Sequence, residues 1–171
     1  LSEIVDGIPF IIILDDIKDG ARQRFTIAHE LGHLLINCDK DIEEKLCNRF
    51  ASALLMPKKA IINEIGNYRK TISFYEYIAV KNEYKVSYAA INYRLKDLNI
   101  INEYLYKKMS IYISTHIGTS DPKPIKPEKT YQYKKIVHKL ENEDIISLIK
   151  ACELLGETDD EFNRDAYNYW Y

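Results

Sequence analysis

The pentapeptide His-Glu-Leu-Gly-His at residues 29–33 constrains the chain more than any other stretch. On a helix, residues four apart share one face, so His29 and His33 would point the same way. Two neutral imidazoles on one face can bind zinc at about 2.0–2.1 Å. Glu30 lies beside that face and can reach a water on the metal. We therefore expect a metal-binding helix with Glu30 as general base, although a helix with two surface histidines fits the same letters.

A catalytic zinc usually takes three protein ligands and leaves one position to water, so a third ligand is needed. Glu44 follows His33 by 11 residues, and Asn48 comes one helical turn after Glu44. A polar neighbour of this kind can hydrogen-bond a ligand histidine and hold its ring. Glu44 is therefore the expected third ligand, and Asn48 the expected support.

The neighbouring acids are weaker candidates for the third ligand. At 100° per residue, Glu43 falls near the middle of the expected apolar stripe of the second helix, whereas Glu44 falls at its edge, where a cleft can reach it. Glu43 is interpreted as a solvated acid of the first turn, favoured by the helix dipole. Asp39 and Asp41 belong to the preceding loop and cap. The expected stripe consists of Leu46, Phe50, Ala53 and Leu54.

Residues 22–33, followed by Glu44-x-x-Cys47-Asn48 and by Ala-Leu-Leu-Met-Pro at 53–57, closely resemble the ImmA/IrrE family of bacterial and phage zinc metallopeptidases. The resemblance implies a gluzincin-like site of two histidines and a glutamate, which selects Glu44, and a Zn²⁺ cofactor. Several members act on helix-turn-helix repressors of mobile elements or of the response to DNA damage. The resemblance therefore implies a DNA-binding repressor as the protein substrate.

The expected fold class is α+β, with a mostly helical, zincin-like core. Residues 8–15 are apolar and β-branched, which predicts a strand before the metal-binding helix. In gluzincins such a strand often binds extended substrate, but a plain packing strand fits equally well. Helices are predicted at 21–37, at 42–55 with Asp41 as N-cap, and at 58–65. The pattern of 104–117 fits either helix or strand.

The chain divides by composition into three parts. Residues 1–117 are expected to form the metallopeptidase domain, which includes a helix-turn-helix-like pair at 71–99. Prolines and polar residues at 118–130 predict a linker. Residues 131–171 return to helical spacing and predict a small helical appendage, with apolar positions at Ile136, Leu140, Ile145, Ile149 and Leu154.

Composition narrows the compartment and the partners. The 171 residues carry a net charge of −2, and the helix-turn-helix-like pair has no basic cluster, so direct nucleic-acid binding is not expected. No run approaches the roughly 18 apolar residues of a membrane span. Three cysteines in no ribbon pattern indicate reduced thiols and a cytoplasmic location. Cys38 remains an alternative fourth ligand of the metal. Because the sequence begins with Leu1 and not with methionine, a missing upstream segment remains an open alternative.

These observations predict a zinc endopeptidase that hydrolyses a specific regulatory protein. Zinc would polarise the scissile carbonyl, and Glu30 would carry the proton from water to the leaving amine. The alternative is a catalytically silent module in which zinc holds an interaction surface. His116, His138 and several tyrosines are all open as oxyanion donors.

Overall fold

The structure is a computed structural model that describes residues 1–13, 17–117, 124–128 and 131–168, with side chains left out at 165–168. It is mostly helical with one small sheet at the start, which confirms the expected α+β class. The chain forms two compact units, Leu1–Glu128 and Lys129–Tyr171. Each unit is described by itself below.

A β-hairpin opens the first unit. Strand β1 (Ser2–Val5) pairs antiparallel with β2 (Ile8–Ile11), and Val5 lies opposite Ile8 beside the turn. The turn residues Asp6 and Gly7 have φ values of 52° and 79°, the left-handed values of a two-residue hairpin turn. The predicted strand at 8–15 corresponds to β2, which ends earlier, at Ile11. The sequence analysis missed β1 because four residues give little alternation to detect.

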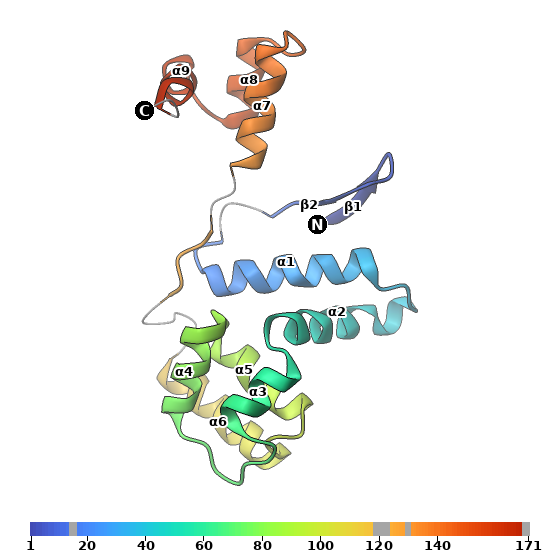
Figure 1. Cartoon of the computed structure of the whole chain (residues 1–171), viewed down its shortest axis with the longest axis vertical. Coiled ribbons are helices and arrows are strands. Elements are labelled where there is room, and N and C mark those ends of the chain that lie inside the picture. Colours follow the sequence, from blue (N-terminus) through green and yellow to red (C-terminus); the bar gives the residue numbers. More distant parts are fainter. Residues whose placement is uncertain (14–16, 118–123, 129–130, 169–171) are drawn as a thin grey trace. The chain divides into compact units, whose positions relative to one another are not determined.

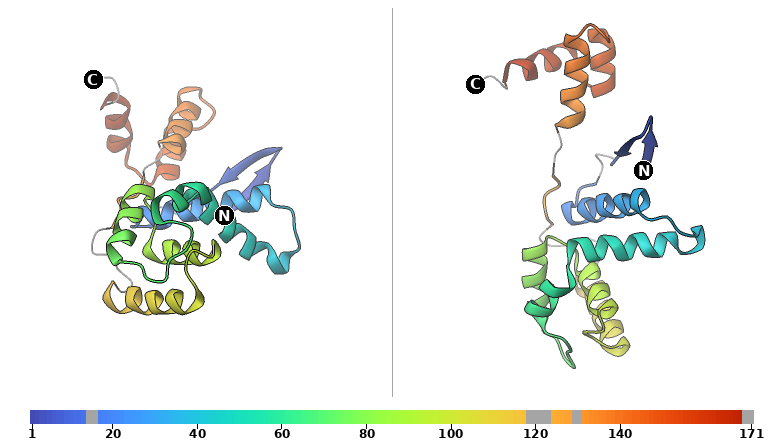
Figure 2. Two further views of the ribbon diagram at one scale, coloured as in Figure 1. Left: turned by 60° about the horizontal axis from the view of Figure 1, so that its bottom comes forward. Right: turned by 45° about the vertical axis from the view of Figure 1, so that its right-hand side comes forward.

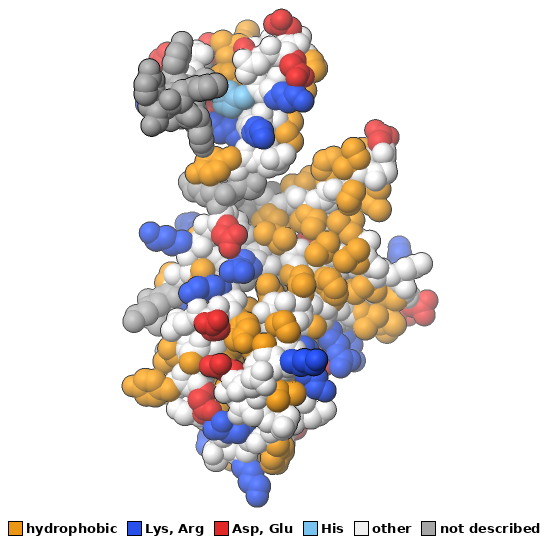
Figure 3. Space-filling model, in the orientation of Figure 1, with side chains coloured by type: hydrophobic (Ala, Val, Ile, Leu, Met, Phe, Trp, Pro, Cys, Tyr) orange, Lys and Arg blue, Asp and Glu red, His pale blue; other side chains and the backbone are white. Residues whose placement is uncertain are grey.

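Both strands contact the helix that follows them, yet the hairpin leaves many apolar side chains exposed. Figure 3 shows hydrophobic side chains gathered over this hairpin and the adjoining helices. The exposed large apolar residues from 1 to 35 are Leu1, Ile4, Val5, Ile8, Phe10, Ile12, Ile27 and Leu35.

Helices α1 (Gly20–Leu35) and α2 (Lys40–Leu55) lie side by side, as the views of Figures 1 and 2 agree. Asp19 caps α1, because its side chain accepts a 2.9 Å hydrogen bond from the Ala21 amide. The predicted N-cap of α2, Asp41, is wrong: Asp39 precedes the helix, and Asp41 lies inside its first turn.

The predicted apolar stripe of α2 is also wrong. The buried residues of α2 are Cys47, Ala51 and Ser52, whereas Leu54 is 51% exposed. The reason is the close approach of α1, which selects small side chains at the contact and turns the larger apolar ones toward its edges.

Four further helices complete the first unit: α3 (Lys58–Ile65), α4 (Phe74–Tyr84), α5 (Tyr88–Asp97) and α6 (Glu103–His116). Helix α6 shows that the ambiguous stretch at 104–117 is helical. These helices enclose the main hydrophobic core. Its largest fully buried side chains include Met56, Tyr77, Ile61, Ile91, Leu95 and Ile100.

In the helix-turn-helix-like pair, α4 and α5, the side chain of Arg94 is buried. Arg94 is 5% exposed; its Nε donates to the Met56 carbonyl at 3.0 Å and its Nη1 to Asp97 at 2.9 Å. Lys96 forms a 2.8 Å ion pair with Glu103. These side chains therefore hold α5 to α2 and to α6.

Residues 124–128, inside the predicted linker, contact the start of α1. The Gly20 amide donates to the Ile125 carbonyl at 2.7 Å, and the side-chain amide of Gln23 exchanges hydrogen bonds of 2.9 and 2.7 Å with the backbone of Glu128. A Cβ on Gly20 would lie 2.4 Å from the Lys126 carbonyl oxygen, so glycine permits this approach.

The second unit contains α7 (Gln132–Asn142), α8 (Leu148–Leu155) and α9 (Asp159–Asn168). Its buried residues are Val137, Ala151, Cys152 and Phe162. Four of the five apolar positions expected from the sequence are instead exposed, with exposed fractions of 43%, 62%, 78% and 38% for Ile136, Ile145, Ile149 and Leu154. In the described part of either unit, no helix is long and apolar enough to cross a membrane.

The two units should separate by truncation. A chain that ends at Glu128 should keep the stability of the first unit, whereas one that ends at Ile117 loses the hydrogen bonds to α1 and roughly 1–4 kcal/mol of unfolding free energy. Thermal unfolding of both chains measures this difference. Equal stability of the two chains would show that residues 124–128 do not support α1.

Candidate metal centre

Three side chains from α1 and α2 converge on one point. His29 Nε2 lies 3.0 Å from His33 Nε2, and the carboxylate oxygens of Glu44 lie 3.4 Å from the first nitrogen and 3.3 Å from the second. These residues form a cluster able to hold a metal ion. The structure therefore brings together the three side chains that the sequence nominated as ligands.

Each histidine also has an acceptor oxygen beside its other ring nitrogen. His33 Nδ1 lies 3.0 Å from Glu43 Oε1, and His29 Nδ1 lies 3.1 Å from Asn48 Oδ1. These oxygens suit the tautomer in which Nδ1 donates and Nε2 has a lone pair for a metal ion. The two Nε2 atoms face each other and the Glu44 carboxylate.

The spacing fits a tetrahedral divalent ion. With ligand bonds of about 2.0–2.1 Å, a tetrahedral site separates its ligand atoms by about 3.3 Å. The three separations here are 3.0, 3.3 and 3.4 Å. Nitrogen and carboxylate donors suit several divalent metals, zinc among them. Three donors also leave a position for water, as in catalytic zinc sites.

Glu43 is a site residue that the sequence analysis misjudged. Its side chain is 29% exposed and accepts from His33, so it is not a solvated acid. The interpretation failed because it relied on an apolar stripe that α2 does not have. The sequence did contain a signal for this role of Glu43. A histidine ligand needs a hydrogen-bond partner for its other ring nitrogen, and Glu43 is adjacent to the expected carboxylate ligand Glu44. Among the described residues, the candidate cluster does not include Cys38.

Glu30 lies beside the hairpin. The side chain is 18% exposed. Burial raises the pKa of this carboxyl, whereas a hydrogen bond from Ser2 lowers it. A carboxylate in this position is able to accept a proton.

Two of the open candidates for the oxyanion donor, His116 and His138, stack on aromatic rings. His116 stacks on Tyr112 in α6, at 4.2 Å between ring centroids. His138 stacks on Phe162 inside the second unit, at 4.0 Å. Neither contact selects an oxyanion donor, and that assignment stays open.

Gly32 allows α1 and α2 to approach as closely as the cluster requires. A Cβ at this position would lie 3.2 Å from both Cα and Cβ of Cys47, tighter than ordinary contact. The absence of a side chain at Gly32 therefore permits the close approach of α2. Because the histidines and Glu44 belong to different helices, this contact sets their separation.

A helix that carries His-Glu-x-x-His, with a glutamate from the next helix facing both histidines, defines the metal centre of a metallopeptidase. Residues 3–96 match the family model described as the IrrE N-terminal-like domain, peptidase family M78, and the chain belongs to this family. The match confirms the ImmA/IrrE resemblance that the sequence showed. Membership implies a divalent metal.

One relative is the radiation response metalloprotease IrrE of Deinococcus radiodurans, 31% identical over 77 residues. The match covers 36% of this chain and 24% of the relative, so this chain spans about a quarter of the relative's length. No solved structure gives a significant match.

Replacing Gly32 by alanine should weaken the metal centre. The added methyl must push α2 away at Cys47, which separates Glu44 from the histidines. We expect a lower melting temperature and a loss of metal affinity, measured by unfolding and by metal titration. Ala28→Gly offers a comparison on the same helix, since it removes a methyl and forces nothing apart. Unchanged affinity in Gly32→Ala would mean that this contact does not set the site.

Proposed function

We propose that this protein is a zinc-dependent endopeptidase that hydrolyses a peptide bond in a specific regulatory protein, a helix-turn-helix repressor of a mobile element or stress response. The observation that supports the proposal is the convergence of two imidazole Nε2 atoms and the Glu44 carboxylate, with separations of 3.0–3.4 Å. Such a donor set suits a divalent cation and leaves one position for water.

Each residue of the centre has a distinct task in this proposal. His29, His33 and Glu44 would hold Zn²⁺, which, when bound, activates water and polarises the scissile carbonyl. Glu30 takes the proton of the attacking water and passes it to the leaving amine. Asn48 and Glu43 keep the imidazoles in the tautomer that leaves Nε2 unprotonated, and they fix the planes of the rings.

The hairpin offers a way to hold an extended substrate. In the two-stranded sheet each strand pairs with one neighbour, so each has an outer edge of backbone donors and acceptors. A peptide could add to such an edge by β-augmentation. Ser2, the first residue of β1, forms a hydrogen bond with Glu30, so a peptide on that strand would pass near the general base.

The repressor substrate and the cytoplasmic location belong together in this proposal. The supporting points are the family membership, the similarity to a radiation response metalloprotease, and three cysteines that are all free thiols. A DNA-binding repressor would meet the enzyme in the compartment that holds the DNA. Direct DNA binding by α4 and α5 is not part of the proposal, because Arg94 is buried and Lys96 is paired.

Glu30→Gln should abolish hydrolysis while it keeps the fold and the metal, because the amide cannot accept the proton. Wild type and variant, both loaded with zinc, are incubated with the repressor encoded nearest to the gene, and the products are identified by mass spectrometry. Cleavage by wild type alone supports the proposal. An intact repressor with both would favour the silent zinc module, and loss of zinc from the variant would make Glu30 a ligand.

Metal titration should rank the acids of α2. Glu44→Ala removes a ligand and should cause the largest loss of zinc affinity. Glu43→Ala and Asn48→Ala release one imidazole each, which typically costs about 10- to 100-fold. Asp41→Ala is the matched control, because Asp41 is an exposed acid of the same first turn. A larger loss in Glu43→Ala than in Glu44→Ala would overturn the assignment.

A further inference from the structure

Alternate residues of the β-hairpin turn their backbone groups away from the partner strand. The Ile12 amide donates to the Leu1 carbonyl at 2.8 Å, so Leu1 and Ile12 form a hydrogen-bonded pair. Hydrogen-bonded and non-hydrogen-bonded pairs alternate along an antiparallel ladder, so Glu3, opposite Phe10, also bonds to β2. The backbone groups of the positions in between point outward. These positions are Ser2 and Ile4 in β1, and Pro9 and Ile11 in β2.

The outer edge of β1 offers a more complete set of backbone groups than the outer edge of β2. Pro9 has no amide hydrogen, so β2 lacks a donor at one of its outward positions. Ser2 and Ile4 each present one donor and one acceptor. Among the residues that the structure describes, no strand pairs with either outer edge. An extended peptide would therefore add to β1 in preference to β2.

The two faces of the hairpin differ in their surroundings. Ser2 and its cross-strand partner Ile11 are half-buried on the face toward α1, where the Ser2 side chain hydrogen-bonds to Glu30. Glu3 follows Ser2 and therefore lies on the opposite face, since side chains alternate along a strand. That face is exposed and apolar apart from Glu3, its one charged residue. Its members are Leu1, Glu3, Val5, Ile8, Phe10 and Ile12.

Glu3 would stand directly opposite one residue of a strand added to β1. Because the backbone groups of Glu3 bond to β2, its pair with the new strand is of the non-hydrogen-bonded kind, in which side chains come closest. The Cβ atoms of such partners lie about 4.5–5.5 Å apart, near enough for an ion pair. In the described part of the chain, the Glu3 carboxylate has no ion pair. A lysine or arginine of the peptide would supply one.

We propose that Glu3 is a specificity-determining residue that selects a basic residue in an extended substrate, a step that rests on the proposed peptidase function. Leu1 and Val5 flank Glu3 on the same face, so the substrate residues opposite them should be apolar. The preferred segment therefore reads apolar-x-basic-x-apolar.

The pairing also places the cut relative to the basic residue. In an antiparallel strand, the residue that follows the basic one lies opposite Ser2, the residue that contacts the general base Glu30. The peptide bond that is hydrolysed should therefore lie on the carboxyl side of the lysine or arginine.

Peptide binding to the full chain tests the proposal without hydrolysis. The zinc-loaded Glu30→Gln variant is titrated, and followed by NMR, with the acetylated and amidated peptide Leu-Thr-Lys-Thr-Val. The amide signals of Ser2 and Ile4 should shift, whereas that of Ile11, on the other edge, should not. The lysine peptide should bind about 1.4- to 5-fold more tightly than its glutamine analogue, the range of an opposite-charge cross-strand pair. Equal affinities, or shifts at Ile11 in place of Ser2 and Ile4, would overturn the proposal.

Matched controls separate the contact with Glu3 from a general attraction of cations. The peptide Leu-Lys-Thr-Thr-Val has the same composition but places lysine on the other face, so its advantage should disappear. Glu3→Lys should reverse the preference in favour of a peptide with glutamate at the centre. Glu83→Lys makes the same change of charge at an exposed position of α4 and should leave the preference unchanged. A lysine preference that survives in Glu3→Lys would contradict the proposal.

Ile4→Pro tests the edge itself. Proline removes an outward amide, as Pro9 does in β2, and an edge position tolerates this change. The variant should keep its zinc affinity and lose the binding of every peptide. Unchanged peptide binding would reject the placement on β1. The Glu3 variants keep the test decisive if this substitution unfolds the hairpin.

The peptide experiment does not depend on hydrolysis, so the two proposals can fail separately. Charge-selective binding together with an uncut repressor would support the role of Glu3 and reject the peptidase. A repressor that is cut with no lysine or arginine before the cut would support the peptidase and reject the role of Glu3. If both hold, every cleavage site should carry a basic residue at one fixed position on the amino side of the cut.

Discussion

The close contact of α1 with α2 at Gly32 and Cys47 is the constraint on which the rest of the site depends. Helix α1 supplies the two imidazoles, and α2 supplies the oxygens that contact them. Glu44 lies at the two Nε2 atoms, whereas Asn48 and Glu43 lie at the two Nδ1 atoms. Each histidine is thus held at both ring nitrogens by the opposite helix. Because the donor atoms come from both helices, they converge only when α1 and α2 lie at the right distance from each other. The contact between Gly32 and Cys47 permits that distance.

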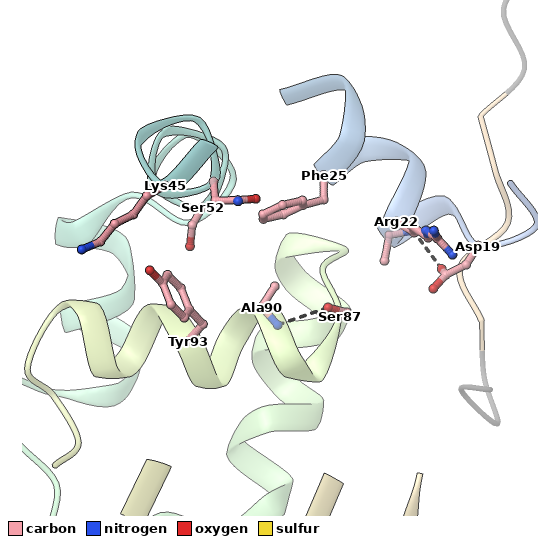
Figure 4. A pocket seen from close by; sticks show the side chains of 10 residues that line it. Asp19, Arg22, Phe25, Lys45, Ser52, Ser87, Ala90 and Tyr93 are labelled. Atoms are coloured by element: carbon pink, nitrogen blue, oxygen red, sulfur yellow. Dashed lines mark hydrogen bonds between the residues drawn. The ribbon is translucent and has the colours of Figure 1, made fainter. Parts of the chain in front are cut away.

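The helices after α2 act as its anchor. Arg94 reaches from α5 to the carbonyl of Met56, the residue that ends α2, and Asp97 pairs with both Arg94 and Arg49. This buried cross-link explains why a helix-turn-helix-like pair stands next to a metal centre. Arg94 of this pair holds one end of α2 and does not contact a phosphate backbone. Together with α1 and α2, helix α5 also lines a cavity (Figure 4).

The electrostatics of the centre are those of a cation site. Three carboxylates, from Glu30, Glu43 and Glu44, lie around the two imidazoles. Cys47, buried between the helices, records this field: burial raises the pKa of its thiol, and the charges of Glu43 and Glu44 raise the pKa further. A protonated, buried thiol serves as a small apolar side chain at the helix contact. A divalent ion at the convergence point would balance much of this negative charge.

The sequence by itself predicted the helix that carries the candidate histidines, nominated Glu44 and Asn48, and indicated the family and the α+β class, because these follow from spacing along a helix and from the identity of donor atoms. Tertiary structure decided which face of α2 is buried, and therefore that Glu43 supports His33 and that Ser52 faces a cavity. Local periodicity could not predict the buried face of α2. The larger apolar residues of α2 mark one face, whereas the face that packs against α1 consists of small side chains. The first strand of the hairpin and the seating of residues 124–128 on α1 likewise depend on contacts between segments that only the folded chain brings together.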